Sequence, residues 1–301
     1  MFEVANDNQK SGLEKAILET IAFFDLFDFP PTVPEIAANL GNKFSLIEVS
    51  AALYNLSKIQ SARGQFFLPG RAEIINIRQA RYNYYRRKLK IARHFARLFS
   101  ICPAVKAICL ANVIGPHNLR DESDIDFFII TAPGKIWQAR LYCAGLTALL
   151  NKRPKKNNKR NKICLSFYVS ADCLNLQDLK LRPADPYFDY WLRNLVLLYN
   201  KEKTYNDFLA ANGLLAHCSD KNIFAPNNQG GNMSLKKRGL IEKLARFFQL
   251  AIMNPALKEA AQQAKGVVIS DQILKLYLKD NRQEYLKKYG DKLQQVFAQN
   301  Y

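Results

Sequence analysis

Two acidic residues stand one residue apart where a polar turn runs into a hydrophobic segment. Asp124 and Asp126 belong to the stretch Ser123-Asp124-Ile125-Asp126, and Phe127 with three further large apolar residues follows at once. Side chains alternate along a β-strand, so a strand that begins here places both carboxylates on one face. Neighbouring carboxylates repel each other, and a divalent cation relieves that repulsion. The pair therefore predicts a Mg²⁺ or Mn²⁺ site, where the metal would polarise a phosphoryl group and orient a nucleophile.

The segments around the pair predict the elements that would position it. Residues 108–114 are typical of a strand that runs into Gly115, and the polar turn then leads to the strand that carries the acidic pair. A helix is predicted at 135–150 and a further strand at 163–169. The expected order is therefore strand, turn, strand, helix and strand.

This order, with a glycine before the turn and Asp-hydrophobic-Asp after it, resembles the nucleotidyltransferase superfamily of the DNA polymerase β type over residues 105–172. The resemblance implies that Asp124 and Asp126 bind the metal and activate an acceptor, which receives a nucleoside monophosphate from an NTP as pyrophosphate leaves. It also implies a nucleotide-binding turn in which Gly115 lets the backbone approach the triphosphate. The nucleotide-binding residues that the resemblance implies are Gly115, Pro116, Ser123 and Arg120.

Three features of the chain depart from the family pattern. Pro116 stands where the family has a phosphate-contacting serine or glycine, which removes one backbone N–H and one hydroxyl. Seven residues separate Pro116 from Asp124, a short spacer for the family. The strand at 163–169 offers Ser166 at the third position in place of a carboxylate, with Asp172 beyond its end. Two hypotheses therefore stay open, an active transferase and a catalytically lapsed protein that serves as a nucleic-acid-binding or regulatory module.

The turn itself offers substitutes for the missing serine. His117, Asn118 and Arg120 could contact phosphate, although such residues are also common in ordinary turns.

The first 78 residues predict a helix at 13–27, two short capped helices and two strand-like runs. Capping boxes at Thr32 with Glu35 and at Ser45 with Glu48 open the short helices. The order resembles a winged helix-turn-helix domain. Its candidate recognition helix at 45–58 carries one lysine and no arginine, so contacts with DNA and contacts with protein both stay open.

Positive charge is concentrated in two segments. Lys and Arg number 44 against 26 Asp and Glu, a net charge of +18 that favours a polyanion or an anionic small molecule as partner. Residues 78–99 predict one long basic helix, and no acid stands between Glu73 and Asp121. Residues 151–162, NKRPKKNNKRNK, hold seven basic residues and predict a loop that is disordered alone and grips phosphate when a ligand is present. The residues expected to contact phosphate, DNA or RNA are Arg86, Arg87, Lys155, Lys156, Lys159 and Arg160.

Aromatic residues are interleaved with the cations of the long helix. They could stack on the bases of a single-stranded nucleic acid. The alternative, which we favour, is a core stripe of Tyr85, Leu89, Ala92 and Phe95 at helical spacing.

The chain as a whole predicts an α+β or α/β protein in four parts. These are a winged helix at 1–78, a basic connecting helix at 79–100, a nucleotidyltransferase-like domain with a mixed sheet at 101–185, and a helical region at 186–301. The helices expected in the last part are 187–199, 204–211, 235–253, 270–278 and 280–297. On overall layout the chain resembles uncharacterised bacterial proteins with a nucleotidyltransferase domain between a winged helix and C-terminal helices.

Cysteine usage and hydropathy exclude several other classes. The six cysteines form no CxxC pair, and the three histidines are not spaced with them as zinc ligands. No signal peptide is evident, and the longest apolar runs fall short of the ~18 residues that a spanning helix needs. We therefore expect a cytoplasmic protein with reduced thiols and no membrane partner, and the oligomeric state stays open.

Overall fold

The computed structural model describes residues 2–40, 44–111, 117–155, 157–181, 184–214, 239–263 and 266–298. The N-terminal part consists of three helices followed by a hairpin, in the order that the sequence predicts. These elements are α1 Phe2–Asp25, α2 Val33–Asn39, α3 Leu46–Asn55, β1 Gln60–Ala62 and β2 Gln65–Phe67. Both predicted capping boxes are present, at Thr32 with Glu35 and at Ser45 with Glu48, and they set where α2 and α3 begin. α1 begins eleven residues before the predicted start at 13.

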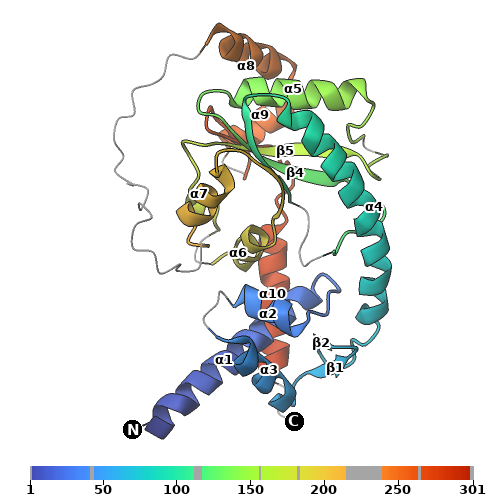
Figure 1. Cartoon of the computed structure of the whole chain (residues 1–301), viewed down its shortest axis with the longest axis vertical. Helices are drawn as coiled ribbons and strands as arrows, with labels where there is room; N and C mark the ends of the chain where they lie inside the picture. The colour runs from blue at the N-terminus through green and yellow to red at the C-terminus, as the bar shows by residue number, and fades with distance from the viewer. Residues whose placement is uncertain are drawn as a thin grey trace.

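One long helix, α4 (Ile74–Ser100), runs along the side of the molecule from the hairpin to the sheet (Figure 1). It begins four residues before the predicted start at 78. Tyr85, Ala92 and Phe95 are buried on one side of it. The core interpretation of these residues is therefore confirmed.

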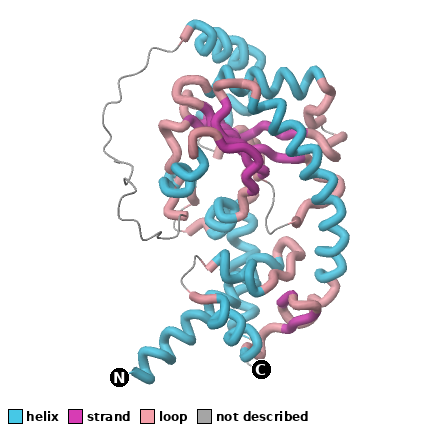
Figure 2. Tube along the Cα trace, in the orientation of Figure 1, coloured by secondary structure: helices cyan, strands magenta, loops and turns pink. Residues whose placement is uncertain are grey.

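Six strands form a single mixed sheet, gathered in the upper half of the view in Figure 2. They are β3 Val105–Leu110, β4 Ile125–Thr131, β5 Ile163–Ser170, β6 Val196–Asn200, β7 Val268–Ile269 and β8 Ile273–Lys275, in the spatial order β6-β3-β4-β5-β8-β7. Among the described strands, β4 and β5 form the one parallel pair, joined by α5 (Ile136–Leu149), and all other neighbours are antiparallel. The protein is thus a mixed α+β fold with a mostly antiparallel sheet.

The remaining elements follow β5 along the chain. They are a 3-10 turn at Gln177–Leu179 and the helices α6 Pro186–Arg193, α7 Thr204–Ala211, α8 Leu240–Ile252, α9 Pro255–Gln262 and α10 Arg282–Ala298. The prediction of a purely helical region after residue 186 is wrong at two places. The end of the helix expected at 187–199 is the strand β6, and the strands β7 and β8 stand where a helix is expected at 270–278. The amide of Asn194 donates to the carbonyl of Tyr190 where α6 ends, and the apolar residues that follow pair with the edge of β3. Such long-range pairing leaves no trace in local periodicity.

The sheet separates two apolar clusters. On β4, Phe128 and Ile130 point into a cluster with α1, α6, α7 and α10, whereas Phe127 and Ile129 point into a cluster with α4 and α5. Because both faces are covered, β4 is a continuous apolar run after its acidic start. The first cluster extends into the N-terminal helices, where the ring of Phe23 stacks on Tyr190 of α6 at a centroid distance of 4.0 Å.

Among the described residues, no helix combines the length and apolar character that crossing a bilayer requires. The described cysteines, Cys102, Cys109, Cys143, Cys164 and Cys173, are free thiols.

Candidate metal centre and ligand cavity

The acidic pair lies at the start of β4. Asp124 directly precedes the strand, and Asp126 is its second residue. A carboxylate oxygen of each and the sulfur of Cys164 all lie within 4.8 Å of one another, and all three side chains are partly exposed. The two carboxylates therefore share one side of the strand and lie close enough to bind one cation together.

The third member of this cluster comes from the neighbouring parallel strand. Cys164 of β5 stands opposite Asp126 in the register of the β4–β5 pair. Burial raises the pKa of the Cys164 thiol well above its ordinary value, and the adjacent Asp126 carboxylate raises it further. The hydroxyl of Ser166, the residue expected at the third position, lies 3.0 Å from the Cys164 sulfur. Asp172 is exposed beyond the opposite end of β5.

The donor set fits a hard divalent cation at the two carboxylates. Mg²⁺ prefers oxygen ligands and is commonly held by one or two carboxylates together with substrate phosphates, and Mn²⁺ accepts the same ligands. Mg²⁺ and Mn²⁺ prefer oxygen donors to sulfur, so the two carboxylates are the expected ligands and Cys164 closes one side of the cluster. Sequence inspection missed this residue, because the position opposite the second aspartate is defined only once the β4–β5 register is known.

Cations from two distant segments approach Asp124. Burial raises the pKa of Asp124, while a hydrogen bond to its own backbone and the charges of Lys159 and Lys88 oppose part of that rise. Lys88 is fully buried on α4 and donates to the backbone carbonyl of Ser123. Burial lowers the pKa of Lys88 in turn, and Asp121 and Asp124 counteract part of the effect. A buried cation thus holds the turn that leads into the acidic pair.

Asp121 ties the two basic segments together beside the pair. Arg87 of α4 donates to one oxygen of its carboxylate, and Arg160 donates to both oxygens at 3.2 and 2.8 Å. Two of the predicted phosphate contacts are thus paired with the Asp121 carboxylate. An incoming phosphate would have to compete with Asp121 for them.

Of the predicted nucleotide-binding residues, Ser123 and Arg120 belong to the part of the chain that the structure describes. Gly115 and Pro116 lie outside the described residues, as does Lys156 of the basic loop. The Ser123 hydroxyl donates to the carbonyl of Arg120, and an Arg120 nitrogen lies 3.9 Å from Asp28, towards the N-terminal helices.

Two further residues of the turn have structural contacts. His117 packs edge-on against the rings of Tyr82 and Tyr85, and the amide of Asn118 bridges Arg81 and the carbonyl of Phe27. These contacts favour the ordinary turn role over phosphate binding.

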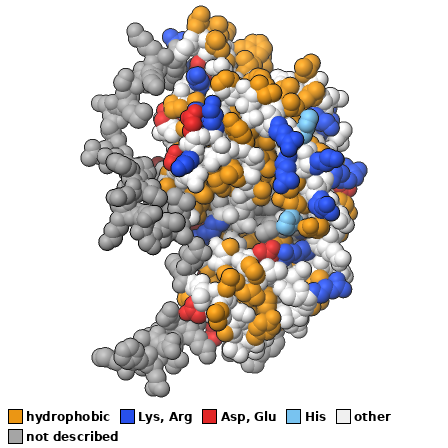
Figure 3. Space-filling view, in the orientation of Figure 1, with side chains coloured by type: hydrophobic (Ala, Val, Ile, Leu, Met, Phe, Trp, Pro, Cys, Tyr) orange, Lys and Arg blue, Asp and Glu red, His pale blue; other side chains and the backbone are white. Residues whose placement is uncertain are grey.

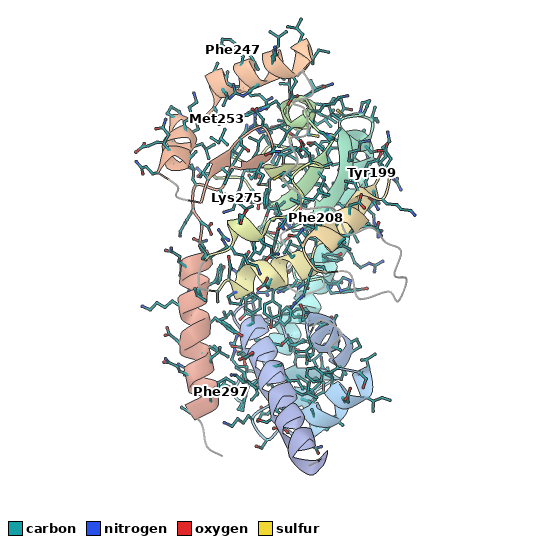
Figure 4. The ribbon with its side chains drawn as sticks, turned by 90° about the vertical axis from the view of Figure 1, so that its left-hand side faces the viewer. Tyr199, Phe208, Phe247, Met253, Lys275 and Phe297 are labelled. Carbon is teal, nitrogen blue, oxygen red and sulfur yellow. The ribbon has the colours of Figure 1, made fainter. Side chains whose placement is uncertain are left out.

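A cavity of about 230 Å³ opens beside Asp126. Apart from Ala111 and Phe167, its other lining residues come from the part of the chain after residue 175, and three of them are cations, Lys275, Lys279 and Arg282. Figure 4 labels Lys275 where the sheet meets α10. The aromatic lining comprises Phe167, Tyr187, Phe188, Trp191, Tyr277 and Tyr285. A cationic and aromatic cavity next to a carboxylate pair suits a planar anionic ligand that carries phosphate.

An ion-pair network holds the cationic wall in place. Arg282 reaches Asp280 at 2.7 Å and Asp185 at 2.6 Å, and Lys275 reaches Asp280 at 2.8 Å. Burial alone would raise the pKa of Asp280, but the hydrogen bonds from Arg282 and Lys275 lower it below its usual range. The sequence alone does not reveal this network, because Lys275 comes beside β5 only through the pairing of β8, and Asp185 and Arg282 belong to the starts of α6 and α10.

A row of exposed cations follows α4. We define the α4 stripe as Arg86, Lys90, Arg93 and Arg97, whose spacing of four, three and four residues places them on one helix face. Basic side chains lie along this side of the molecule in Figure 3. Other cations of α4 are neutralised by acids distant in sequence, Arg78 by Glu35 and Arg81 by Asp28. The local lack of acid therefore overstates the free charge of the helix.

Comparisons of the chain with protein-family models, with curated proteins and with solved structures find no match.

Proposed function

We propose that this chain is a metal-dependent nucleotidyltransferase that transfers a nucleoside monophosphate from an NTP to an acceptor and releases pyrophosphate. The observation that carries the proposal is the position of Asp126, which belongs both to the acidic pair and to the wall of the cationic and aromatic cavity. One side chain thus connects a place for a divalent cation with a place for a phosphate-bearing ligand.

Different residues of the described site would contact the metal, the phosphates and the base of such a substrate. Asp124 and Asp126 would hold Mg²⁺ or Mn²⁺, which supplies charge neutralisation and Lewis-acid polarisation at the transferred phosphorus. Lys275, Lys279 and Arg282 would contact the phosphates from the opposite wall. The tyrosines of the cavity would stack on the base.

The arrangement of elements also supports the fold that we propose. β3 and β4 form an antiparallel pair, α5 then connects β4 to the parallel strand β5, and the acidic pair lies at the start of β4. This arrangement agrees with a nucleotidyltransferase domain of the DNA polymerase β type. Three helices and a hairpin in the order α1, α2, α3, β1 and β2 agree with an N-terminal winged helix.

A transfer screen tests this function. Each labelled NTP is incubated with the full chain, with Mg²⁺ or Mn²⁺, and with RNA, protein and small-molecule acceptors. We expect label to appear on one acceptor class and to disappear in the variant with both Asp124→Asn and Asp126→Asn. Asp121→Asn is the matched control, since it removes a nearby carboxylate outside the pair, and it should retain transfer. Equal transfer by the double variant would refute the proposal.

A second function is favoured by the α4 stripe. Four cations on one helix face, with Lys155 and Lys159 exposed on the basic loop, suit the backbone of DNA or RNA. In that case the chain would be a catalytically lapsed nucleic-acid-binding or regulatory module. Three results together would favour this function. The protein shows no transfer activity, its binding to an oligonucleotide weakens as salt is added, and neither aspartate substitution changes that binding.

A further inference from the structure

Helix α8 is packed against the domain by a face that contains two polar residues, and Leu250 packs partly against the same core cluster. Glu242, Ala245 and Gln249 are its buried side chains, at a spacing that defines one helix face. The Glu242 carboxylate accepts hydrogen bonds from the backbone N–H groups of Trp137 and Gln138, at 2.9 and 2.8 Å, and so caps the first turn of α5. Gln249 donates to the carbonyl of Trp137. These directional contacts fix the rotation of α8 about its own axis.

This rotation turns the large apolar residues of α8 to the outside. Phe247 is 75% exposed and Phe248 is 53% exposed. We define the α8 apolar stripe as Leu240, Ile241, Leu244, Phe247, Phe248 and Ile252, all of them exposed. α8 lies at one end of the molecule in Figure 1, and Figure 4 shows Phe247 on its outer side. Soluble proteins rarely expose contiguous apolar surface of this kind without a partner for it.

The charged residues beside the stripe are Lys243 and Arg246, and the Arg246 guanidinium is paired with Asp271 at 3.0 Å. A shallow groove on α8 is lined by Lys243 and Arg246 together with Phe247, Leu250 and Ala251. The single acid of the helix, Glu242, is buried against α5. The whole chain adds a net charge of +18. The surface therefore combines apolar side chains with positive charge and offers no exposed acid of α8.

We propose that α8 is an interfacial helix that docks the protein on an anionic lipid surface. Amphipathic helices with Lys and Arg beside Phe and Leu lie in the plane of the membrane interface and bury their apolar side in the headgroup region. At 13 residues α8 is too short to cross a bilayer, so it would lie along the membrane surface. The phenylalanines would insert between the headgroups, and Lys243 would contact lipid phosphate.

A second copy of the chain suits the surface less well. A two-fold contact through the α8 apolar stripe would bring the Lys243 side chains of two copies together, while Arg246 stays paired with Asp271. α8 has no exposed acid to pair with them, and two chains of net charge +18 repel each other at low salt. Charge complementarity therefore favours the anionic lipid.

Vesicle sedimentation tests the proposal with the full chain. We expect the wild type to sediment with phosphatidylcholine vesicles that contain phosphatidylserine and much less with phosphatidylcholine alone. Removing one buried phenylalanine corresponds to about tenfold or more in partitioning, so Phe247→Ser with Phe248→Ser should weaken binding by at least that factor. Ile47→Ser, at a residue of α3 that is 82% exposed, is the matched control and should change binding less than twofold.

A charge variant and a fluorescent variant complete the test. Lys243→Gln should weaken binding to the anionic vesicles more than Lys287→Gln, which removes an exposed charge on α10. Brominated lipids should quench the new tryptophan in Phe247→Trp and should not quench the one in Ile47→Trp. The wild-type tryptophans, Trp137 and Trp191, are both buried and give the background signal.

Three results would overturn the proposal. The first is vesicle binding by the double serine variant equal to that of the wild type, which would mean that charge alone drives the contact. The second is an unquenched Phe247→Trp variant. The third is a dimer in sedimentation equilibrium that dissociates in the double serine variant, while vesicle binding by that variant is unchanged. This result would identify a second copy of the chain as the partner.

Discussion

Replacing Arg282 by methionine removes the group that organises the cationic wall of the cavity. The Arg282 guanidinium donates to both carboxylate oxygens of Asp280, to Asp185 at 2.6 Å and to the carbonyl of Leu179 at 2.8 Å. The side chain of Asp185 is only 1% exposed. Removing one partner of a buried ion pair costs about 3–5 kcal/mol. Because the N–H of Phe188 still donates to Asp185 and Lys275 still pairs with Asp280, we expect the lower end, about 3 kcal/mol.

The same substitution should change how stability depends on pH. Asp280 has a depressed pKa in the folded protein, so its contribution is present above the ordinary carboxyl pKa of about 4 and is lost as the pH falls. Arg282→Met removes part of that contribution at neutral pH. The wild type should therefore lose more stability than the variant between about pH 5 and pH 3, and the difference between them should shrink.

Urea unfolding at pH 7 and near pH 3.5, followed by circular dichroism, measures both effects. Arg282→Lys is the matched control, because it keeps the charge and cannot bridge Asp280 and Asp185 with one planar group, so its midpoint should fall between the other two. A loss below 1 kcal/mol for Arg282→Met at pH 7, or a difference that grows on acidification, would refute this account of the network.

Three further predictions concern α8, the core and the α4 stripe. Glu242→Ala leaves two N–H groups of α5 without their acceptor, so it should lower the free energy of unfolding in urea by about 2–3 kcal/mol. Glu259→Ala, at an exposed residue, should lower it by less than about 0.5 kcal/mol, and equal losses in the two variants would contradict the capping role. Phe128→Ala leaves a cavity at a fully buried site between the sheet and α7, so it should lower the free energy of unfolding by about 3–5 kcal/mol in the same assay. Phe297 is 38% exposed, and a loss as small as that of Phe297→Ala would show that the cluster is loosely packed. If the chain binds single-stranded nucleic acid, replacing all four residues of the α4 stripe by glutamine should reduce the slope of log affinity against log salt concentration by about 3. Fluorescence anisotropy measures this slope, and an unchanged slope would place the contact elsewhere.

Local signals in the sequence predict the elements whose ends are marked by caps or by a change in polarity. The two capping boxes start α2 and α3 where expected, and α7 has the predicted bounds. The alternation of side chains predicts that Asp124 and Asp126 share one side, and their distance agrees with it. These features depend on residues within one turn or one strand, so the sequence alone is sufficient for them.

Features that depend on distant pairing could not be predicted in the same way. β6 and β8 are strands because β3 and β5 offer them open edges, while their own residues are equally compatible with helix. Cys164 joins the acidic pair only through the register of β5 against β4. The same limit hid the neutralisation of Arg78 by Glu35, which lies 43 residues earlier in the chain.

Asp124 and Asp126 should together bind a divalent cation in the presence of a nucleotide. Electron paramagnetic resonance of Mn²⁺, titrated into the full chain with a non-hydrolysable ATP analogue, measures this directly. We predict that free Mn²⁺ is depleted by the wild type and by Asp121→Asn, and that the variant with both Asp124→Asn and Asp126→Asn restores the signal of protein-free analogue. Equal depletion of free Mn²⁺ by the double variant and the wild type would contradict the account.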